Sequence, residues 1–185
     1  MFRHVVALVL VLCCLSPALS PAWAQGDGAG AAERARAANV VRFPKTTTPA
    51  FLIDLLGNWA TQEDQFGGLQ VFPNDHSSAI YLSVTRDPQY VDHPLKDVAT
   101  AIGNAAGIKE FTRQEPATLS GIEGEAFYAV MKNQRGVELD VKMVLAPLES
   151  DLWGVEMTMT PKNLGASARA QINQMVGRIT LTKTP

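Results

Sequence analysis

The sequence predicts an α+β domain, an antiparallel β-sheet with helices packed on it. Its second half contains several segments in which apolar and polar residues alternate, as they do in strands with one buried and one solvated face. Short polar turns join these segments, which favours antiparallel pairing of consecutive strands. Two other segments carry apolar residues at helical spacing, and we expect the helices there.

In the first half, apolar runs bounded by turn residues predict three strands. They cover Phe51–Leu55, Leu69–Phe72 and Ala79–Thr85. A helix is expected next, because apolar residues recur at i, i+3, i+4 and i+7 from Leu95 to Ile102. Pro94 suits its first turn, a polar residue before the proline can cap it, and Gly107 suits its end.

The second half adds further strands and one helix. We expect strands at Lys109–Gln114, Ala117–Ser120, Glu125–Met131, Val137–Leu145 and Trp153–Met159, then a helix at about Gly165–Gly177 and a short strand or tail. Trp153 is in phase with Val155 and Met157, so we place it in the core. Glu156 belongs to the alternate set of the same strand, which we expect to face water.

The N-terminal 24 residues have the layout of a secretory signal peptide. Arg3 lies in a short basic start, an apolar run covers Val5–Leu15, and Ala22-Trp23-Ala24 forms a cleavage pattern that leaves Gln25 as the new N-terminus. We therefore expect a periplasmic or secreted protein. The predicted organisation is a signal at 1–24, a flexible or irregular segment at 25–49 and a single α+β domain at 50–185.

The composition limits the chemistry of the mature chain. Both cysteines, Cys13 and Cys14, lie in the signal, so the exported domain has neither a disulfide nor a thiolate. Leu12 precedes Cys13, where a lipid-attachment motif needs a small residue, and this disfavours a lipid anchor. The formal net charge of −2 gives no broad attraction to nucleic acid. No later apolar run reaches the roughly 20 residues of a transmembrane helix.

Three stretches resemble the PsbP-like fold group, which includes exported bacterial DcrB-like proteins. They are the strand, small turn and tryptophan from Phe51 to Trp59, the proline–leucine helix entry before Val98, and the glycine-rich turn from Leu119 to Phe127. The resemblance implies an α/β/α sandwich. It also implies a binding or assembly protein rather than an enzyme, and it transfers no catalytic residue, because the group has no common catalytic set.

Candidate chemical groups are sparse in the mature chain. His76 and His93 each follow an aspartate, which is compatible with a metal site but more typical of turns. Ser120 is flanked by Leu119 and Gly121 rather than by a nucleophile motif, so we interpret it as a turn residue. We expect no metal and no cofactor.

Acidic residues leave a carboxylate-dependent hydrolase open as an alternative, because two carboxylates at a set separation can hydrolyse glycosides. The candidates are Glu123, Glu125, Glu138, Asp140 and Glu156, for which a solvated polar face is the simpler interpretation.

Aromatic residues are the best candidates for a binding surface, because they often anchor interfaces. We select Trp59, which follows a turn, and Tyr81 and Tyr128, which are out of phase with the apolar residues of their strands. Two positions stay open for these tyrosines, on a face that a helix covers or on an exposed face. The leading hypothesis is a non-enzymatic exported protein that binds another envelope protein or supports an envelope complex. The alternative is a carrier of a small apolar molecule or lipid between sheet and helix.

Overall fold

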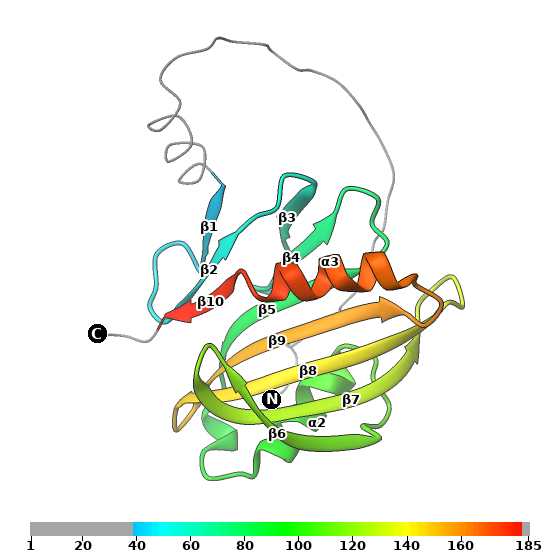
Figure 1. Ribbon diagram of the computed structural model, residues 1–185. Coiled ribbons are helices and arrows are strands. Elements are labelled where there is room, and N and C mark those ends of the chain that lie inside the picture. The colour runs from blue at the N-terminus through cyan, green and yellow to red at the C-terminus, as the bar shows by residue number, and fades with distance from the viewer. Residues whose placement is uncertain (1–38, 183–185) are drawn as a thin grey trace, which may run out of the picture.

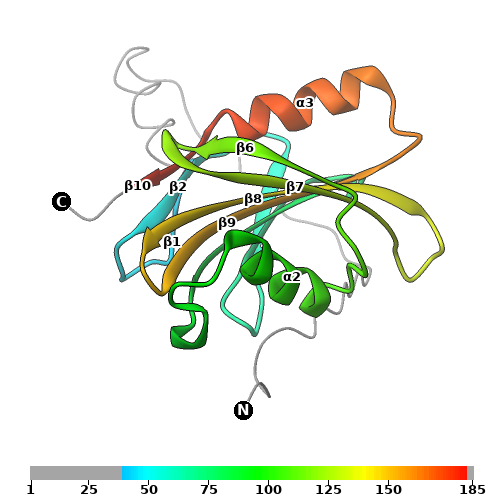
Figure 2. The same ribbon diagram turned by 90° about the horizontal axis from the view of Figure 1, so that it is seen from below.

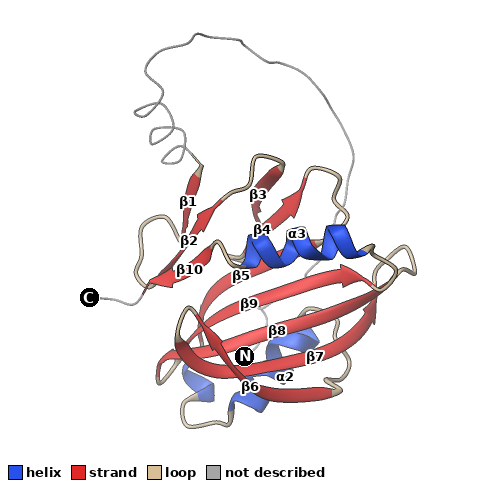
Figure 3. Ribbon diagram, in the orientation of Figure 1, coloured by secondary structure: helices blue, strands red, loops and turns tan. Residues whose placement is uncertain are grey.

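The computed structural model describes residues 39–182, and strands make up about half of this part of the chain (Figure 3). The predicted signal at 1–24, including Cys13 and Cys14, and residues 25–38 of the predicted linker lie outside the described residues. The structure confirms the α+β class, with two antiparallel sheets and two α-helices within the described part.

Seven strands form the larger sheet, in which every pair of neighbours is antiparallel. In spatial order they are β3 (Trp59–Glu63), β4 (Leu69–Pro73), β5 (Ala79–Arg86), β9 (Leu152–Pro161), β8 (Glu138–Glu149), β7 (Ile122–Lys132) and β6 (Arg113–Leu119). The long hairpin β7–β8 and the hairpin β8–β9 follow the alternation in the sequence. As a result, β9, which comes late in the chain, lies at the centre of the sheet.

Two predictions for this sheet need correction. The segments Lys109–Gln114 and Ala117–Ser120 were expected as separate strands, but Arg113–Leu119 is one strand, because it pairs without interruption from Tyr128 back to Ile122. Strand β3 was not predicted. Its outer residues are polar and only Trp59 is buried, so the sequence lacks an apolar pattern there.

A second sheet of three strands was also not predicted. It consists of β1 (Val40–Phe43), β2 (Ala50–Asp54) and β10 (Ile179–Thr182), with β2 in the middle. The strands therefore begin at Val40, within the 25–49 segment, where we expected irregular or edge-like chain. Leu181 pairs with Phe51, which is far from it in the sequence. A pairing between such distant residues produces no local pattern in the sequence.

The two helices cover opposite faces of the larger sheet (Figure 2). Helix α2 (Leu95–Ala105) ends as predicted, since Gly107 adopts φ 82° just beyond it. Its start differs from the prediction, because Pro94 is the N-cap and no side chain caps the first turn. Helix α3 (Ala166–Val176) has the predicted position between two glycines.

Each face of the larger sheet has its own hydrophobic core. On the α2 side, Trp153, Val155 and Met157 pack with Val98 and Ala99, so the prediction that Trp153 is a core residue is confirmed. On the α3 side, the core includes residues of α3, of β4 and β5, and of the smaller sheet. Together with the small sheet, the layers form a helix–sheet–helix sandwich (Figure 1).

The central strand β9 is buried on both faces, which corrects the expectation that one of its faces is wet. The β9 residues that alternate with Trp153, Val155 and Met157 face α3 and the smaller sheet. Leu181 of β10 packs directly over one of them, Gly154. Glu156 is consequently only 6% exposed. The local alternation resembles that of a half-exposed strand, but a central strand beneath two covering layers has no solvated face.

Candidate functional site

Charged and aromatic side chains gather on the α3-side face of β6, β7 and β8. The pairing register places Arg113 opposite Tyr128, and Tyr128 opposite Lys142, so the three residues cross the strands in one row. Side chains two residues apart on a strand share a face, which adds Glu115 and Val130 to the same surface. In Figure 1 the end of β6 crosses in front of β7 and β8, but no helix lies in front of these two strands. We call this surface, made of these five residues, the Tyr128 face.

Tyr128 is held in place from two sides. The Arg113 guanidinium carbon lies 3.7 Å from the centre of the Tyr128 ring, a cation–π contact. The Tyr128 hydroxyl donates a hydrogen bond to the Glu115 carboxylate, and this bond, with a further contribution from burial, raises the pKa of the phenol. The ring is therefore half-buried and oriented before any partner arrives, while Val130 and Lys142 beside it are exposed.

Glu156 lies on the same side of the sheet, deeper toward the centre. Its register neighbours are Leu82 on β5 and Val144 on β8, both buried. Burial raises the pKa of Glu156 to about 7, although the nearby Lys142 ammonium acts in the opposite direction. A carboxyl group in this environment changes charge near neutral pH.

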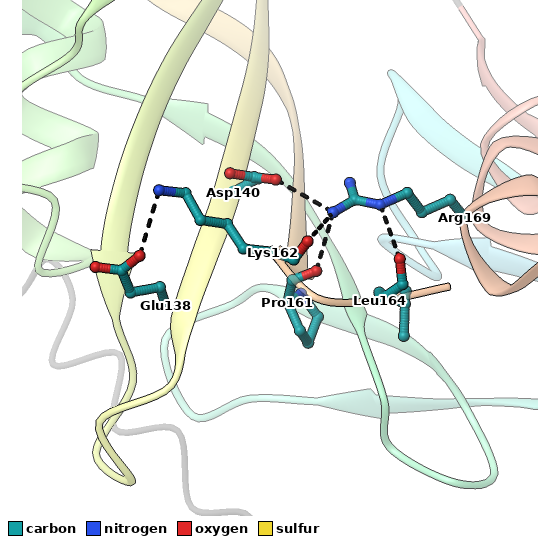
Figure 4. Close-up of polar contacts among 6 residues, drawn as sticks. All are labelled: Glu138, Asp140, Pro161, Lys162, Leu164 and Arg169. Atoms are coloured by element: carbon teal, nitrogen blue, oxygen red, sulfur yellow. Dashed lines mark hydrogen bonds and ion pairs between the residues drawn. The ribbon is translucent and has the colours of Figure 1, made fainter. Parts of the chain in front are cut away.

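Arg169 links α3 to the α3-side face of the larger sheet (Figure 4). Its guanidinium donates to the backbone carbonyls of Pro161, Lys162 and Leu164, at 3.1, 2.9 and 3.2 Å, and pairs with the Asp140 carboxylate at 3.3 Å. The connection from β9 to α3 therefore folds around one side chain. Arg169 positions α3, which forms the border of the α3-side face.

Two of the five acidic candidates are engaged in ion pairs. Glu138 pairs with Lys162 at 3.3 Å and Asp140 with Arg169. Asp140 and Glu156 share a face, but their register levels differ by four residues, about 13 Å along the strands. That separation exceeds what either type of glycosidase uses.

The other two acidic candidates lie elsewhere. Glu123 and Glu125 alternate with Tyr128 on β7 and therefore face the α2 side. Glu125 accepts a hydrogen bond from the Gln114 side chain at 2.6 Å. The geometry of these residues gives no support to the hydrolase alternative.

Two of the three aromatics selected for a binding surface are buried. Tyr81 is 6% exposed and packs over Gly68, where a side chain would collide with its ring; burial raises the pKa of Tyr81 to about 12. Trp59 is also 6% exposed and belongs to the α3-side core. Trp59 was expected at the surface because it follows a turn, whereas Tyr81 lies in the α2-side core, the helix-covered position that was one of the two open for it. Of the predicted trio, Tyr128 keeps an accessible position.

The histidines and Ser120 occupy turns or helix starts. His76 stacks on Phe72 with ring centres 4.6 Å apart, and His93 pairs with Asp97 at 3.4 Å. Within residues 39–182, no group of three or more histidine, cysteine or acidic side chains is arranged to hold a metal ion. Ser120 lies in the β6–β7 turn at φ 52°, as predicted, and its hydroxyl accepts a hydrogen bond from the Leu181 amide at 2.6 Å.

The space between α2 and the sheet is small. A pocket of about 50 Å³ lies between α2 and the sheet, lined by residues that include Ile102 and Trp153. This volume is far below the roughly 300–1,000 Å³ of ordinary ligand pockets. The geometry there does not favour the lipid-carrier alternative.

Comparison with known proteins identifies the fold. No protein-family model and no curated protein matches the chain. The solution structure of cyanobacterial PsbP (CyanoP) from Synechocystis sp. PCC 6803 matches with a TM-score of 0.54, over 78% of this chain and 94% of that one, at 9% identity. The chain has a PsbP-like fold. This match confirms the resemblance predicted from the sequence as far as the fold is concerned. At 9% identity, the match shows a shared fold and gives no information about function.

Two other solved structures are similar to a lesser degree. One is LpqN, involved in cell envelope biogenesis of Mycobacterium tuberculosis, with a TM-score of 0.42, 14% identity, and coverage of 77% of this chain and 89% of that one. The other is a protein from Bacteroides thetaiotaomicron VPI-5482, with a TM-score of 0.48 and 10% identity, covering 72% of this PsbP-like chain but 45% of that chain. None of the helices between residues 39 and 182 is both long and apolar enough to cross a membrane.

Proposed function

We propose that this PsbP-like protein is a non-enzymatic exported protein that binds an envelope protein through the Tyr128 face. The observation that carries the proposal is the arrangement of Tyr128 between the Arg113 guanidinium and the Glu115 carboxylate. Tyrosine and arginine are the residue types that most often dominate binding energy at interfaces. A ring already held in one orientation loses little conformational entropy when a partner covers it.

The surroundings of the ring fit the same role. Val130 supplies exposed apolar surface, and the exposed Lys142 supplies a charge at the edge. An apolar centre with a polar rim is the usual composition of a protein interface. Export is supported by the basic start, apolar run and cleavage pattern of the first 24 residues.

Site-specific photocrosslinking in the native host tests the binding surface. A photoreactive phenylalanine analogue at Val130 is expected to give a discrete adduct with one envelope protein. The same analogue at the exposed Lys96 on α2, the opposite face, serves as the control and is expected to give none. The captured protein is then purified, and its direct affinity is measured for the wild-type chain and for Arg113→Ala and Tyr128→Ala.

Each alanine variant is expected to weaken that affinity about tenfold or more, as for truncated interface anchors. Equal adducts from both positions, or an affinity that neither variant changes, contradicts the proposal. Mass spectrometry of the protein from the envelope fraction tests export separately, with Gln25 as the expected first residue.

A further inference from the structure

A buried carboxyl group is the neighbour of a lysine on the Tyr128 face. Glu156 on β9 is two residues from Thr158, and Thr158 lies opposite Lys142 in the β8–β9 register. Glu156 and Lys142 are therefore diagonal neighbours, with their Cα atoms roughly 7–8 Å apart, a distance that a lysine side chain can span. Lys142 also lies opposite Tyr128 on β7. Lys142 consequently adjoins both the buried carboxyl and the aromatic ring.

The other groups around Glu156 are apolar or already have polar partners. On the same face, β5 presents Ile80, Leu82 and Val84, and β8 presents Val144. The charged residues of the neighbouring strands and of the covering layer are engaged elsewhere: Arg42 with the Thr47 carbonyl, Glu63 with Lys45, Arg86 with Glu149 and Asp151, Asp54 with Arg178, Glu115 with Arg113 and Tyr128, and Asp140 with Arg169. Lys142 is the charged residue that acts on Glu156.

The charges of the Tyr128 face indicate what kind of partner it fits. Among residues 39–182, Lys142 has no carboxylate within ion-pair distance, and its side chain is exposed, like that of Arg113. While Glu156 is neutral, Arg113 and Lys142 give the face two positive charges against the negative charge of Glu115. Opposite charges on facing surfaces steer association and fix the orientation of a complex. The face therefore fits a partner that places an acidic side chain against Lys142.

The charge of Glu156 sets how strongly that contact forms. Glu156 is 6% exposed among aliphatic side chains, and burial raises its pKa to about 7, so it is neutral at lower pH and negative at higher pH. The negative form attracts the Lys142 ammonium and repels an incoming carboxylate. We propose that Glu156 competes with an acidic residue of the bound envelope protein for Lys142, so that binding through the Tyr128 face weakens as the pH rises through neutrality. This regulation rests on the binding function proposed above.

The interaction between the two side chains is tested first in the free protein. Protein labelled with ¹³C at the glutamate carboxyl groups is titrated by NMR as wild type, Lys142→Met and Lys96→Met, and Glu156→Gln assigns the Glu156 signal. Lys142→Met keeps an unbranched side chain and removes the ammonium, so the Glu156 pKa is expected to rise above its wild-type value. Lys96 is exposed on α2, on the opposite side of the sheet, and its substitution is expected to leave the Glu156 pKa unchanged.

The effect on binding is measured with the protein captured from the Val130 position. Its affinity is determined at pH 6 and pH 8 for the wild type, Glu156→Gln and Lys142→Met. Glu156→Gln carries an amide that stays neutral, so any pH dependence that remains in this variant belongs to other groups. Relative to Glu156→Gln, the wild type is expected to lose about fivefold in affinity between pH 6 and pH 8, the low end of coupling between linked sites. Lys142→Met is expected to bind weakly at both pH values and to lose this fivefold ratio.

The possible outcomes separate this regulation from the binding function. An unchanged Glu156 pKa in Lys142→Met overturns the regulation without involving a partner. Equal pH ratios for the wild type and Glu156→Gln also overturn it, while the binding function of the Tyr128 face stands. The absence of a discrete adduct at Val130 contradicts the binding function itself, and the regulation falls with it.

Discussion

The carbonyl oxygen of Leu145 on β8 lies where a side chain at Gly124 on β7 would stand. A Cβ atom built at Gly124 approaches that oxygen, and the adjoining Leu145 carbonyl carbon and Ala146 Cα, more closely than real Cβ atoms do. The obstacle is backbone within a paired ladder, so it has little freedom to move aside. The β7–β8 pair, which carries Tyr128, therefore depends on a glycine at position 124.

Gly124→Ala is accordingly expected to lower the free energy of unfolding by about 3 kcal/mol, at the upper end of overpacking effects. Urea unfolding followed by circular dichroism measures it. Gly57→Ala is the control, because a Cβ there has no neighbour within 4 Å, and its effect should stay within about 0.5 kcal/mol. Equal effects of the two substitutions would show that the contact with Leu145 is not the cause.

The buried Glu156 carboxyl should make stability depend on pH. Its pKa is about 7 in the folded chain against an ordinary value of 4.5, so the folded state holds this proton over a range in which the unfolded state has released it. Stability then falls as pH rises from about 4.5 to above 7.

Glu156→Gln removes this dependence, since its amide does not ionise. At pH 8 the variant is expected to be more stable than the wild type by about 3 kcal/mol, and at pH 4 nearly equal to it. Urea titrations at both pH values measure the difference. A difference that is constant across the pH range would refute the burial effect.

Arg169 should matter more through the carbonyls it binds than through its ion pair. Arg169→Met keeps the aliphatic stem but loses the hydrogen bonds to Pro161, Lys162 and Leu164, with an expected cost of about 1–2 kcal/mol. Asp140→Asn weakens only a half-exposed pair, and its cost should be below about 0.5 kcal/mol. Thermal unfolding of both variants tests this order, and a larger loss for Asp140→Asn would reverse it.

The raised pKa of Tyr128 should depend on Glu115. Glu115→Gln removes the carboxylate that accepts the phenol proton and repels the phenolate, so the Tyr128 pKa is expected to fall toward its ordinary value. NMR titration of ¹³C-labelled tyrosine measures it, and Tyr81 on the other side of the sheet is the internal control. An unchanged Tyr128 pKa would show that burial rather than Glu115 sets it.

Local patterns predicted most of the elements correctly. The two helices were found because one amphipathic stripe and two flanking glycines are features of a single segment. The β7–β8 hairpin was found for the same reason, since its strands are adjacent in the chain and joined by a polar turn. The smaller sheet was missed, because β1, β2 and β10 meet only after the whole chain has folded.

The candidate site was predicted only in part. Tyr128 was selected because it is out of phase with its apolar neighbours, and the structure places it half-buried on the α3 side. Its contacts with Arg113 and Glu115 come from a neighbouring strand whose register the sequence does not reveal. Trp59 was selected as a surface residue, although α3 and the smaller sheet bury it.

Sequence alone therefore determined the α+β class, the helices and the long hairpin, because hydrophobic periodicity and turn chemistry act within a few residues. Tertiary structure decided which faces of those elements meet water. It placed β9 at the centre of the larger sheet, so that Glu156 is enclosed although its alternation matches that of a half-exposed strand. The burial of a side chain depends on whether segments distant in the sequence cover it. The periodicity within one strand gives no information about that.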